Sequence, residues 1–235
     1  MYAILTDFVT THIRGEKNRA FIQQLCTQNV LTPEKHLFYS AFLNTQGRVI
    51  FDAYITFHDD EAYLIHPQCM IPHVIEHLQR YAPFSKVTLH STLSPWYALA
   101  NNPKGHILPH MPYTLTLSCP ENYAPQDAWY HTEITHGIPR IRHTHSGLWT
   151  AHMLDMDKVH AISYQKGCYL GQEITHRTAH KGQVKKGLYR GPTIPFDDLS
   201  IPQPLISSVH PDALSLYVLE HQDATRYPAL TRVYP

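Results

Sequence analysis

The chain has 235 residues and equal numbers of basic and acidic side chains, 19 of each, so its formal net charge at pH 7 is zero. This balance argues against a protein that coats nucleic acid, and we expect no direct nucleic-acid partner. No apolar run approaches the ~18 residues of a membrane-spanning helix, and the first residues do not resemble a secretion signal, so we expect a cytoplasmic chain with no membrane partner.

The first half of the chain predicts an α+β unit. Apolar residues at helical spacing indicate one amphipathic helix near the start and a second after three strands. Two β-rich runs on either side of NTQG indicate a hairpin, because its glycine can adopt the positive φ of a tight turn. The expected elements are a helix at 16–28, the hairpin at 36–57, a strand at 61–67, a helix at 70–82 and a strand at 85–91. This order is typical of an antiparallel sheet covered by helices.

Prolines interrupt residues 101–126, where the sequence predicts loops and a single strand at 113–119. The elements expected beyond them are a helix at 127–136 that ends at Gly137, a short strand at 160–164, and a helix at 169–182 that ends at Gly182. Frequent prolines and short alternating runs after Arg190 predict a small β-barrel-like or sheet module. Such a module is too short to bury much core alone, so we expect it to pack against the rest of the chain.

The stretch QKGCYLGQE, residues 165–173, concentrates several reactive residue types. Gly167 and Gly171 allow the backbone to turn sharply, and Cys168 falls in the turn before the predicted helix. The partial positive charge at the start of that helix and the neighbouring Lys166 both favour a thiolate. The pattern therefore predicts a reactive thiol beside a basic region that suits an anionic ligand.

A structural interpretation of the same stretch remains open. Cys168 would then be a small buried residue in a glycine-rich connection. Glu173 lies four residues before Arg177, so the two side chains would form an ion pair on one helix face with no further role.

The other cysteines and the histidines suggest no metal site. None of the four cysteines forms a C-x-x-C pair, so the usual zinc-ribbon and iron–sulfur ligand motifs are absent, and reduced thiols are expected. Four of the 19 histidines form two pairs, His73/His77 and His176/His180, with the i,i+4 spacing of one helix face. Neither pair has an H-E-x-x-H pattern or a carboxylate in the usual place, and we predict no metal ligands.

The longer run HAISYQKGCYLGQEITHRTAHKGQVKKGLYR resembles the signature of the YgfZ-type folate-binding proteins. Supporting likenesses lie in FIQQLCTQNV, in LNTQGRVIFDAYI and in HGIP, so that the resemblance covers roughly residues 12–90 and 127–190. In the R-x-x-x-G-I-P segment typical of the family, Glu133 stands in place of the arginine. The positions that match the signature are Lys166, Gly167, Cys168, Tyr169, Gly171, Gln172, Glu173, Arg177 and Gly182.

This resemblance implies a relationship to the aminomethyltransferase, or T-protein, of the glycine cleavage system. It implies an aminomethyltransferase-like folate-binding fold of class α+β, with antiparallel sheets around a central funnel and a short C-terminal β-barrel-like module. The implied division is an N-terminal folate-binding α+β subdomain at 1–95, a second α+β subdomain with the K-G-C-Y motif at 96–183, and a β module at 184–235.

The resemblance also implies a function. The expected cofactor is tetrahydrofolate, or a one-carbon-substituted folate, and the expected role is an accessory one in assembling or repairing iron–sulfur cluster enzymes, including those that modify tRNA. The expected partners are such cluster enzymes or cluster assembly proteins, and Cys168 would be the key thiol. Two alternatives remain: a one-carbon transferase that resembles the T-protein, and a metal- or pH-responsive protein that uses its histidines.

Folate is a flat pterin with an anionic glutamate tail, so its site needs an apolar slot, an acceptor for the pterin amino and N–H groups, and cations. Asp52 is the candidate acceptor; it corresponds to the second of two aspartates in the T-protein, and Phe51 occupies the first position. Only one of the two acids is present, which argues against one-carbon transfer. The residues expected to bind folate are Thr27, Asn29, Asp52, Lys166, Tyr169, Gln172, Glu173 and Arg177.

Overall fold

The computed structural model describes residues 2–32, 37–58, 60–93, 96–100, 106–107, 113–117, 121–194, 203–209 and 213–234. Its largest sheet has five antiparallel strands in the order β3-β4-β5-β2-β6. The strands are β2 (Phe8–Arg14), β3 (Leu37–Leu43), β4 (Val49–His58), β5 (Glu61–Pro67) and β6 (Thr88–Thr92). The predicted hairpin and the strands predicted at 61–67 and 85–91 are thereby confirmed.

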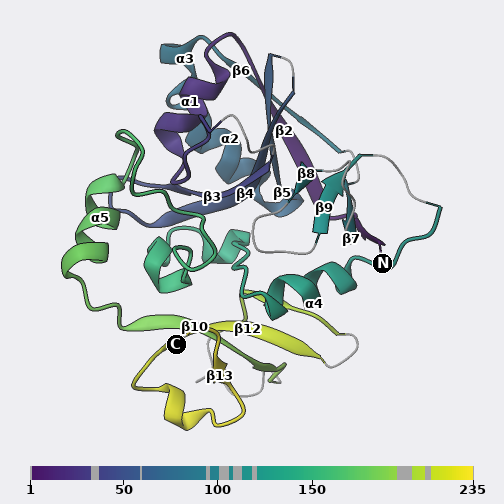
Figure 1. Cartoon of the computed structure of the whole chain (residues 1–235), viewed down its shortest axis with the longest axis vertical. Helices are drawn as coiled ribbons and strands as arrows, with labels where there is room; N and C mark the ends of the chain where they lie inside the picture. Colours follow the sequence, from purple (N-terminus) through teal and green to yellow (C-terminus); the bar gives the residue numbers. More distant parts are fainter. Residues whose placement is uncertain are drawn as a thin grey trace.

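Helices cover one face of this sheet (Figure 1). They are α1 (Asn18–Leu25), α2 (Ile71–Gln79) and the short α3 (Ala82–Ser85), and a 3-10 turn, η1 (Gln68–Met70), precedes α2. The helix predicted at 70–82 is therefore divided in two. Phe42 and Phe51 stack at 4.3 Å between their ring centroids, and both contact the ring of His77 on α2. All seven residues of β3 are buried, as expected for a sheet that is covered on both faces.

A second antiparallel sheet joins the start of the chain to its middle. Its strand order is β1-β7-β9-β8, from β1 (Tyr2–Leu5), β7 (Trp96–Ala100), β8 (His106–Ile107) and β9 (Tyr113–Thr116). Strand β9 confirms the described part of the strand predicted at 113–119, whereas residues 118–120 lie outside the described residues. Strands β1, β2, β7 and β8 were not predicted from the sequence.

The segment 138–171 covers the other face of the five-stranded sheet. It follows α4 (Asp127–Thr135), which confirms the helix predicted at 127–136, and contains only the 3-10 turns η2 (His143–His145) and η3 (Ala151–Leu154). The strand predicted at 160–164 was wrong. The Ser163 N–H donates to the Thr27 carbonyl at 3.0 Å, and the Thr27 hydroxyl donates to the Ala161 carbonyl at 2.6 Å. Thr27 lies in a loop, so these bonds do not continue into a ladder.

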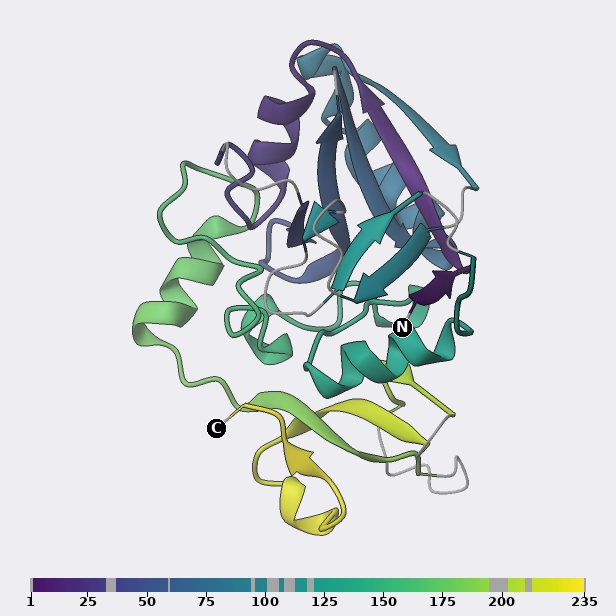
Figure 2. The ribbon, with the colours of Figure 1, turned by 45° about the vertical axis from the view of Figure 1, so that its right-hand side comes forward.

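The C-terminal module packs beneath α4 (Figures 1 and 2). The helix α5 (Gln172–Lys181), which confirms the helix predicted at 169–182, leads into a sheet with the strand order β11-β12-β10-β13. The predicted barrel is not confirmed, because in the described residues this sheet is open. Its outer strands have two residues each, too few to meet and close. The strands are β10 (Lys186–Pro192), β11 (Ile206–Ser207), β12 (Leu214–Glu220) and β13 (Thr231–Arg232), and a 3-10 turn, η4 (Ala224–Arg226), precedes the last.

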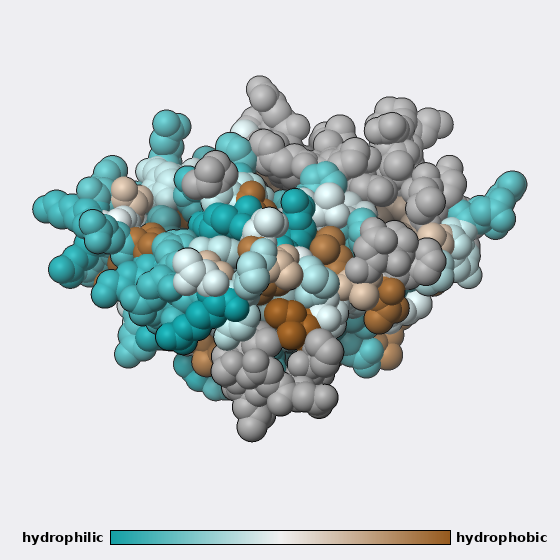
Figure 3. Space-filling model, turned by 90° about the horizontal axis from the view of Figure 1, so that it is seen from below, coloured by the Kyte–Doolittle hydropathy of each residue, from teal (hydrophilic) through white to brown (hydrophobic). Residues whose placement is uncertain are grey.

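The surface is mixed in character. Seen from the side of the C-terminal sheet, the described residues are mostly hydrophilic, and hydrophobic side chains form separate small patches (Figure 3). Apolar side chains scattered in this way are ordinary on protein surfaces. Among the described helices, none has the length and hydropathy to span a bilayer. The predicted domain boundaries after residues 95 and 183 stay predictions.

Residues 165–171 form a loop before α5, called the motif loop below. Gly171 is required where this loop meets the β3–β4 turn. Its φ is +80°, and a Cβ there would lie 2.7 Å from the Asn44 carbonyl oxygen and 2.9 Å from the Leu43 Cβ. We expect Gly171→Ala to lower the free energy of unfolding by about 1–3 kcal/mol, measured by chemical denaturation. Gly167→Ala is the control, because a Cβ at Gly167 meets no atom within 4 Å. Equal effects of the two substitutions would contradict this assignment.

Candidate functional site

Lys166 anchors the motif loop inside the protein. Its side chain is 8% exposed, and its ammonium donates to the carbonyls of Gln23 and Cys26 at 2.6 Å and of Gln28 at 3.0 Å. These carbonyls lie at and beyond the end of α1, where backbone acceptors lack helical partners and a cation is favoured. Burial lowers the pKa of Lys166, and Cys26 opposes that shift. The lysine therefore holds the loop against the body of the protein.

The thiol that Lys166 approaches is Cys26 rather than Cys168. The Lys166 Nζ lies 3.9 Å from the Cys26 Sγ, and a role for Lys166 at Cys168 stays a prediction. Burial raises the pKa of the Cys26 thiol, although Lys166 lowers it. Cys26 is completely buried, and a buried protonated thiol of this kind is inert.

Cys168 lies on the outside of the same loop. It is an exposed free thiol, and the interpretation as a small buried cysteine is therefore wrong. The next residue, Tyr169, turns inward and is 6% exposed, with its ring centroid 4.8 Å from the Lys166 Nζ. Burial raises the pKa of Tyr169 to about 12. The two buried neighbours fix the loop and present the thiol to solvent.

The helix α5 displays the polar residues that follow the motif. Gln172 forms a hydrogen bond with His176 at 3.3 Å. Glu173 and Arg177 are both exposed, and the structure pairs neither with the other, so the predicted ion pair is not formed. Arg177 borders a cavity of about 410 Å³, together with Lys181 one turn further along the helix.

Thr27 and Asn29 lie in the loop after α1 and have structural partners. Thr27 is fully buried, and its hydroxyl donates to Ala161. The Asn29 Oδ1 accepts from the Gln23 side chain at 3.0 Å and from the Leu31 N–H at 3.2 Å. These bonds shape the loop that receives Lys166.

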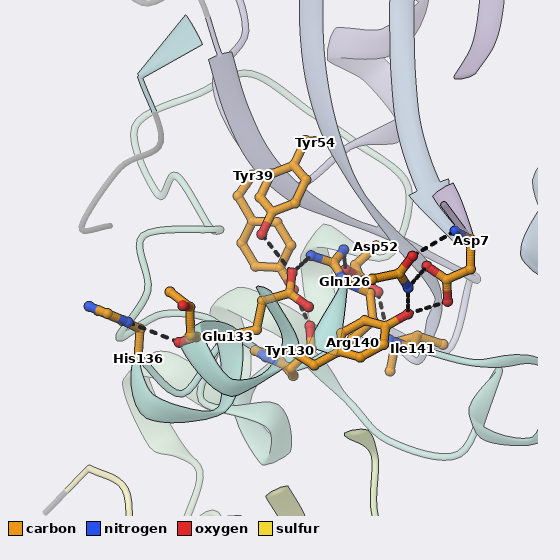
Figure 4. Close-up of polar contacts among 12 residues, drawn as sticks. Asp7, Tyr39, Asp52, Tyr54, Gln126, Tyr130, Glu133, His136, Arg140 and Ile141 are labelled. Atoms are coloured by element: carbon orange, nitrogen blue, oxygen red, sulfur yellow. Dashed lines mark hydrogen bonds and ion pairs between the residues drawn. The ribbon is translucent and has the colours of Figure 1, made fainter. Parts of the chain in front are cut away.

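Asp52 lies on β4 in a closed ionic network beneath the five-stranded sheet (Figure 4). Its Oδ2 pairs with the guanidinium of Arg140, and its Oδ1 accepts from the Ile141 N–H at 2.7 Å. Arg140 also pairs with Glu133, which accepts from the Tyr54 hydroxyl at 2.9 Å. The three charged residues are 0% exposed. Asp52 is thus neither free nor solvated, and both its oxygens are occupied.

The electrostatic interactions inside this network favour the charged form of Arg140. Burial alone would lower the pKa of Arg140, but the carboxylates of Asp52 and Glu133 raise it well above its usual range. Burial raises the pKa of Asp52, and Arg140 opposes that rise. The guanidinium also lies 4.7 Å from the ring centroid of Tyr54, a distance at which cation and ring attract.

Sequence reasoning missed Arg140, and little in the sequence signals it. Arg140 directly follows HGIP, and Arg142 follows two residues later, yet only Arg140 is completely buried. The one usable signal was Glu133, which stands where the R-x-x-x-G-I-P segment has an arginine. A buried glutamate at this position needs a cation as its partner.

The predicted site residues fall into three separate groups. Lys166, Tyr169, Thr27 and Asn29 build and hold the motif loop; Gln172, Glu173 and Arg177 lie on α5; and Asp52 belongs to the buried network. In the described part of the chain, no three metal-binding side chains lie close enough to hold an ion.

Comparison with known proteins defines the class. Residues 5–101 match the family described as the GCVT N-terminal domain. The structure matches the glycine cleavage system aminomethyltransferase T from Bartonella henselae with a TM-score of 0.67, over 93% of this chain and 78% of that chain, at 10% sequence identity. That identity shows the fold alone. The chain has the aminomethyltransferase-like fold, with antiparallel sheets.

Curated relatives define the relationship more narrowly. An iron-sulfur cluster assembly factor IBA57 homolog from Pyricularia oryzae is 28% identical over 224 residues, which are 82% of this chain and 57% of that protein. The tRNA-modifying protein YgfZ from Colwellia psychrerythraea is 24% identical over 226 residues, which are 79% of this chain and 69% of that protein. The chain spans less than two thirds of the length of the fungal relatives. The predicted resemblance is confirmed: the chain is related to the YgfZ and IBA57 proteins.

Proposed function

We propose that the chain is a tetrahydrofolate-binding accessory protein for the assembly or repair of iron–sulfur cluster enzymes, including enzymes that modify tRNA, with Cys168 as its key thiol. Two relatives support this role, since their names describe an iron-sulfur cluster assembly factor and a tRNA-modifying protein. The proposed partners are cluster enzymes or cluster assembly proteins.

The exposed Cys168 is the observation that carries the proposal. An accessible thiol can bind a soft metal ion or exchange with another thiol, whereas a buried one cannot. The loop around it is held from inside by three hydrogen bonds from Lys166 to carbonyls. A thiol fixed in position at the surface suits transient contact with a cluster on a partner protein.

Folate binding is the second part of the proposal. Arg177 and Lys181 are exposed cations beside a cavity, which suits the anionic glutamate tail. A pterin that reached Asp52 would have to replace Arg140, because both carboxylate oxygens are already bound. The same occupancy argues against a T-protein-like transfer reaction that uses Asp52.

The proposed location is the cytoplasm. The fungal relatives carry the word mitochondrial in their names, so cell fractionation is the deciding measurement. Recovery of the protein with mitochondria would replace the cytoplasmic assignment and leave the proposed chemistry unchanged.

Titration with tetrahydrofolate tests the proposal. We expect saturable binding by the wild-type chain and about tenfold weaker binding by Arg177→Ala, which corresponds to about 1.4 kcal/mol. Arg226→Ala is the control, because Arg226 is an arginine of η4 whose side chain is 74% exposed and which lies outside the motif. Unchanged affinity in Arg177→Ala would remove that residue from the site. Absence of binding by the wild-type chain would contradict the folate part.

A further inference from the structure

A cavity of about 310 Å³ lies where α2, the β3–β4 turn and the motif loop meet. Its walls include Asn44 of the turn, His77 and Arg80 at the end of α2, and the apolar side chains of Ile50 and Leu170. This volume is near the lower end of the range for ligand sites, about 300–1,000 Å³. None of the residues predicted to bind folate lines it, so the cavity is independent of the function proposed above.

His77 gives this cavity a polar group that the protein leaves unpaired. The side chain is 6% exposed, and its Nε2 is buried without a hydrogen-bond partner. The ring contacts three aromatic neighbours, with centroids 5.7 Å from Phe51, 5.8 Å from Tyr81 and 6.5 Å from Phe42. A buried polar atom without a partner costs about 1–3 kcal/mol.

Burial lowers the pKa of His77 to about 4. At neutral pH the ring is therefore uncharged and carries one N–H. It is able to donate one hydrogen bond to a ligand without bringing a second charge into the cavity.

Two of the other lining groups, Asn44 and Arg80, have unused hydrogen-bond donors. The Asn44 Oδ1 already accepts from the N–H groups of Gln46 and Arg48, both at 3.0 Å. Its amide nitrogen has no partner among the described residues. Arg80 uses one nitrogen for Glu76, and its other N–H groups remain available. Spare donors in a small cavity select a ligand that carries acceptor oxygens.

The charge of the residues that line the cavity narrows the chemical class of the ligand further. Arg80 is the cation, and Glu76 already offsets it. His73 and His143 form a hydrogen bond with each other at 3.0 Å across the same region. A nearly neutral lining favours a monoanion over a phosphate dianion. We propose that this cavity binds a small carboxylate, with its oxygens at His77 and Arg80 and its apolar part against Ile50 and Leu170.

Isothermal titration with sodium benzoate and sodium butyrate tests this site, with benzamide as the uncharged analogue and inorganic phosphate as the dianion. We expect at least one carboxylate to bind with a Kd of about 1 mM or tighter, and benzamide and phosphate to bind at least tenfold more weakly. His77→Phe keeps an aromatic ring against Phe51 but removes the nitrogen, and Arg80→Met removes the cation. Each is expected to weaken carboxylate binding at least tenfold.

His90→Phe is the matched control, because His90 is an exposed residue of β6 outside the cavity. It should bind carboxylates as the wild-type chain does. A measurement on the wild-type chain avoids dependence on the folding of any variant: the ¹⁵N chemical shifts of the His77 ring should change on addition of the carboxylate. Absence of carboxylate binding, unchanged binding by His77→Phe, tighter binding of phosphate, or an unchanged His77 spectrum would each overturn the proposal.

Discussion

Replacement of Arg140 by methionine is expected to lower the free energy of unfolding by about 3–5 kcal/mol, because it leaves two buried carboxylates without their cation. Asp52, Glu133 and Arg140 are all 0% exposed, so water cannot take the place of the lost guanidinium. The measurement is chemical denaturation at pH 8. Arg80→Met is the control, since Arg80 and Glu76 form a pair on the surface with side chains 63% and 65% exposed, and such pairs contribute about 1 kcal/mol or less.

The same variant should show a characteristic dependence on pH. Burial already raises the pKa of Asp52, and without Arg140 nothing comparable opposes that rise. A carboxyl whose folded pKa is raised stabilises the fold only while it is protonated, and that contribution is lost as pH rises through the folded pKa. The deficit of Arg140→Met relative to wild type should therefore be smaller at pH 5 than at pH 8.

Two further results bear on this prediction. Addition of Glu133→Gln to Arg140→Met should recover part of the lost stability, because one of the two unpaired charges is then removed. An effect of Arg140→Met below about 1 kcal/mol, or a deficit that does not change with pH, would show that the ionic network does not stabilise the fold.

Substitution of Cys168 by serine is expected to abolish function while it leaves the fold intact. The thiol is exposed, so its removal should change the free energy of unfolding by no more than about 0.5 kcal/mol. Serine cannot supply a thiolate, and the proposed contact with a cluster or a partner thiol would be lost. The measurement is the activity of cluster-dependent enzymes in a deletion strain that expresses the variant.

Cys69→Ser provides the matched control, because Cys69 is also an exposed free thiol but lies in η1, outside the motif. It should restore enzyme activity fully. Full restoration by Cys168→Ser as well would show that the thiol is not needed, and the proposed role of Cys168 would have to be abandoned.

The local sequence pattern was sufficient to predict some helices and strands of this fold but not others. The β3–β4 hairpin and α5 follow from β-rich runs around a glycine turn and from helical spacing. Strand β2 was missed because its Thr10, Thr11 and His12 do not alternate with apolar residues. Two of these are buried only because β2 lies between β5 and β6, where the Thr11 hydroxyl pairs with His66 at 2.8 Å.

The strand predicted at 160–164 is the opposite case, because the local pattern favours a strand that the structure does not contain. Its residues favour a strand, but a strand needs an edge to pair with, and His160 has a left-handed φ of +53°. The Gln28 side chain donates to the His160 carbonyl, and Thr27 bonds to Ser163 and Ala161, but both partners lie in a loop and not in a strand. The distance along the chain between Thr27 and Ala161, 134 residues, is beyond the reach of any local pattern.

The sequence by itself determined the motif loop, because glycines, a turn and a following helix are local properties of neighbouring residues. It also determined the family resemblance. Only the tertiary structure decided which charges meet: Lys166 turns to backbone carbonyls and Cys26, and Asp52 meets Arg140 from 88 positions away. The strength of a Coulombic pair depends on the distance between the charges and on their burial. Both are set only when the sheet, the segment 138–171 and α4 pack together.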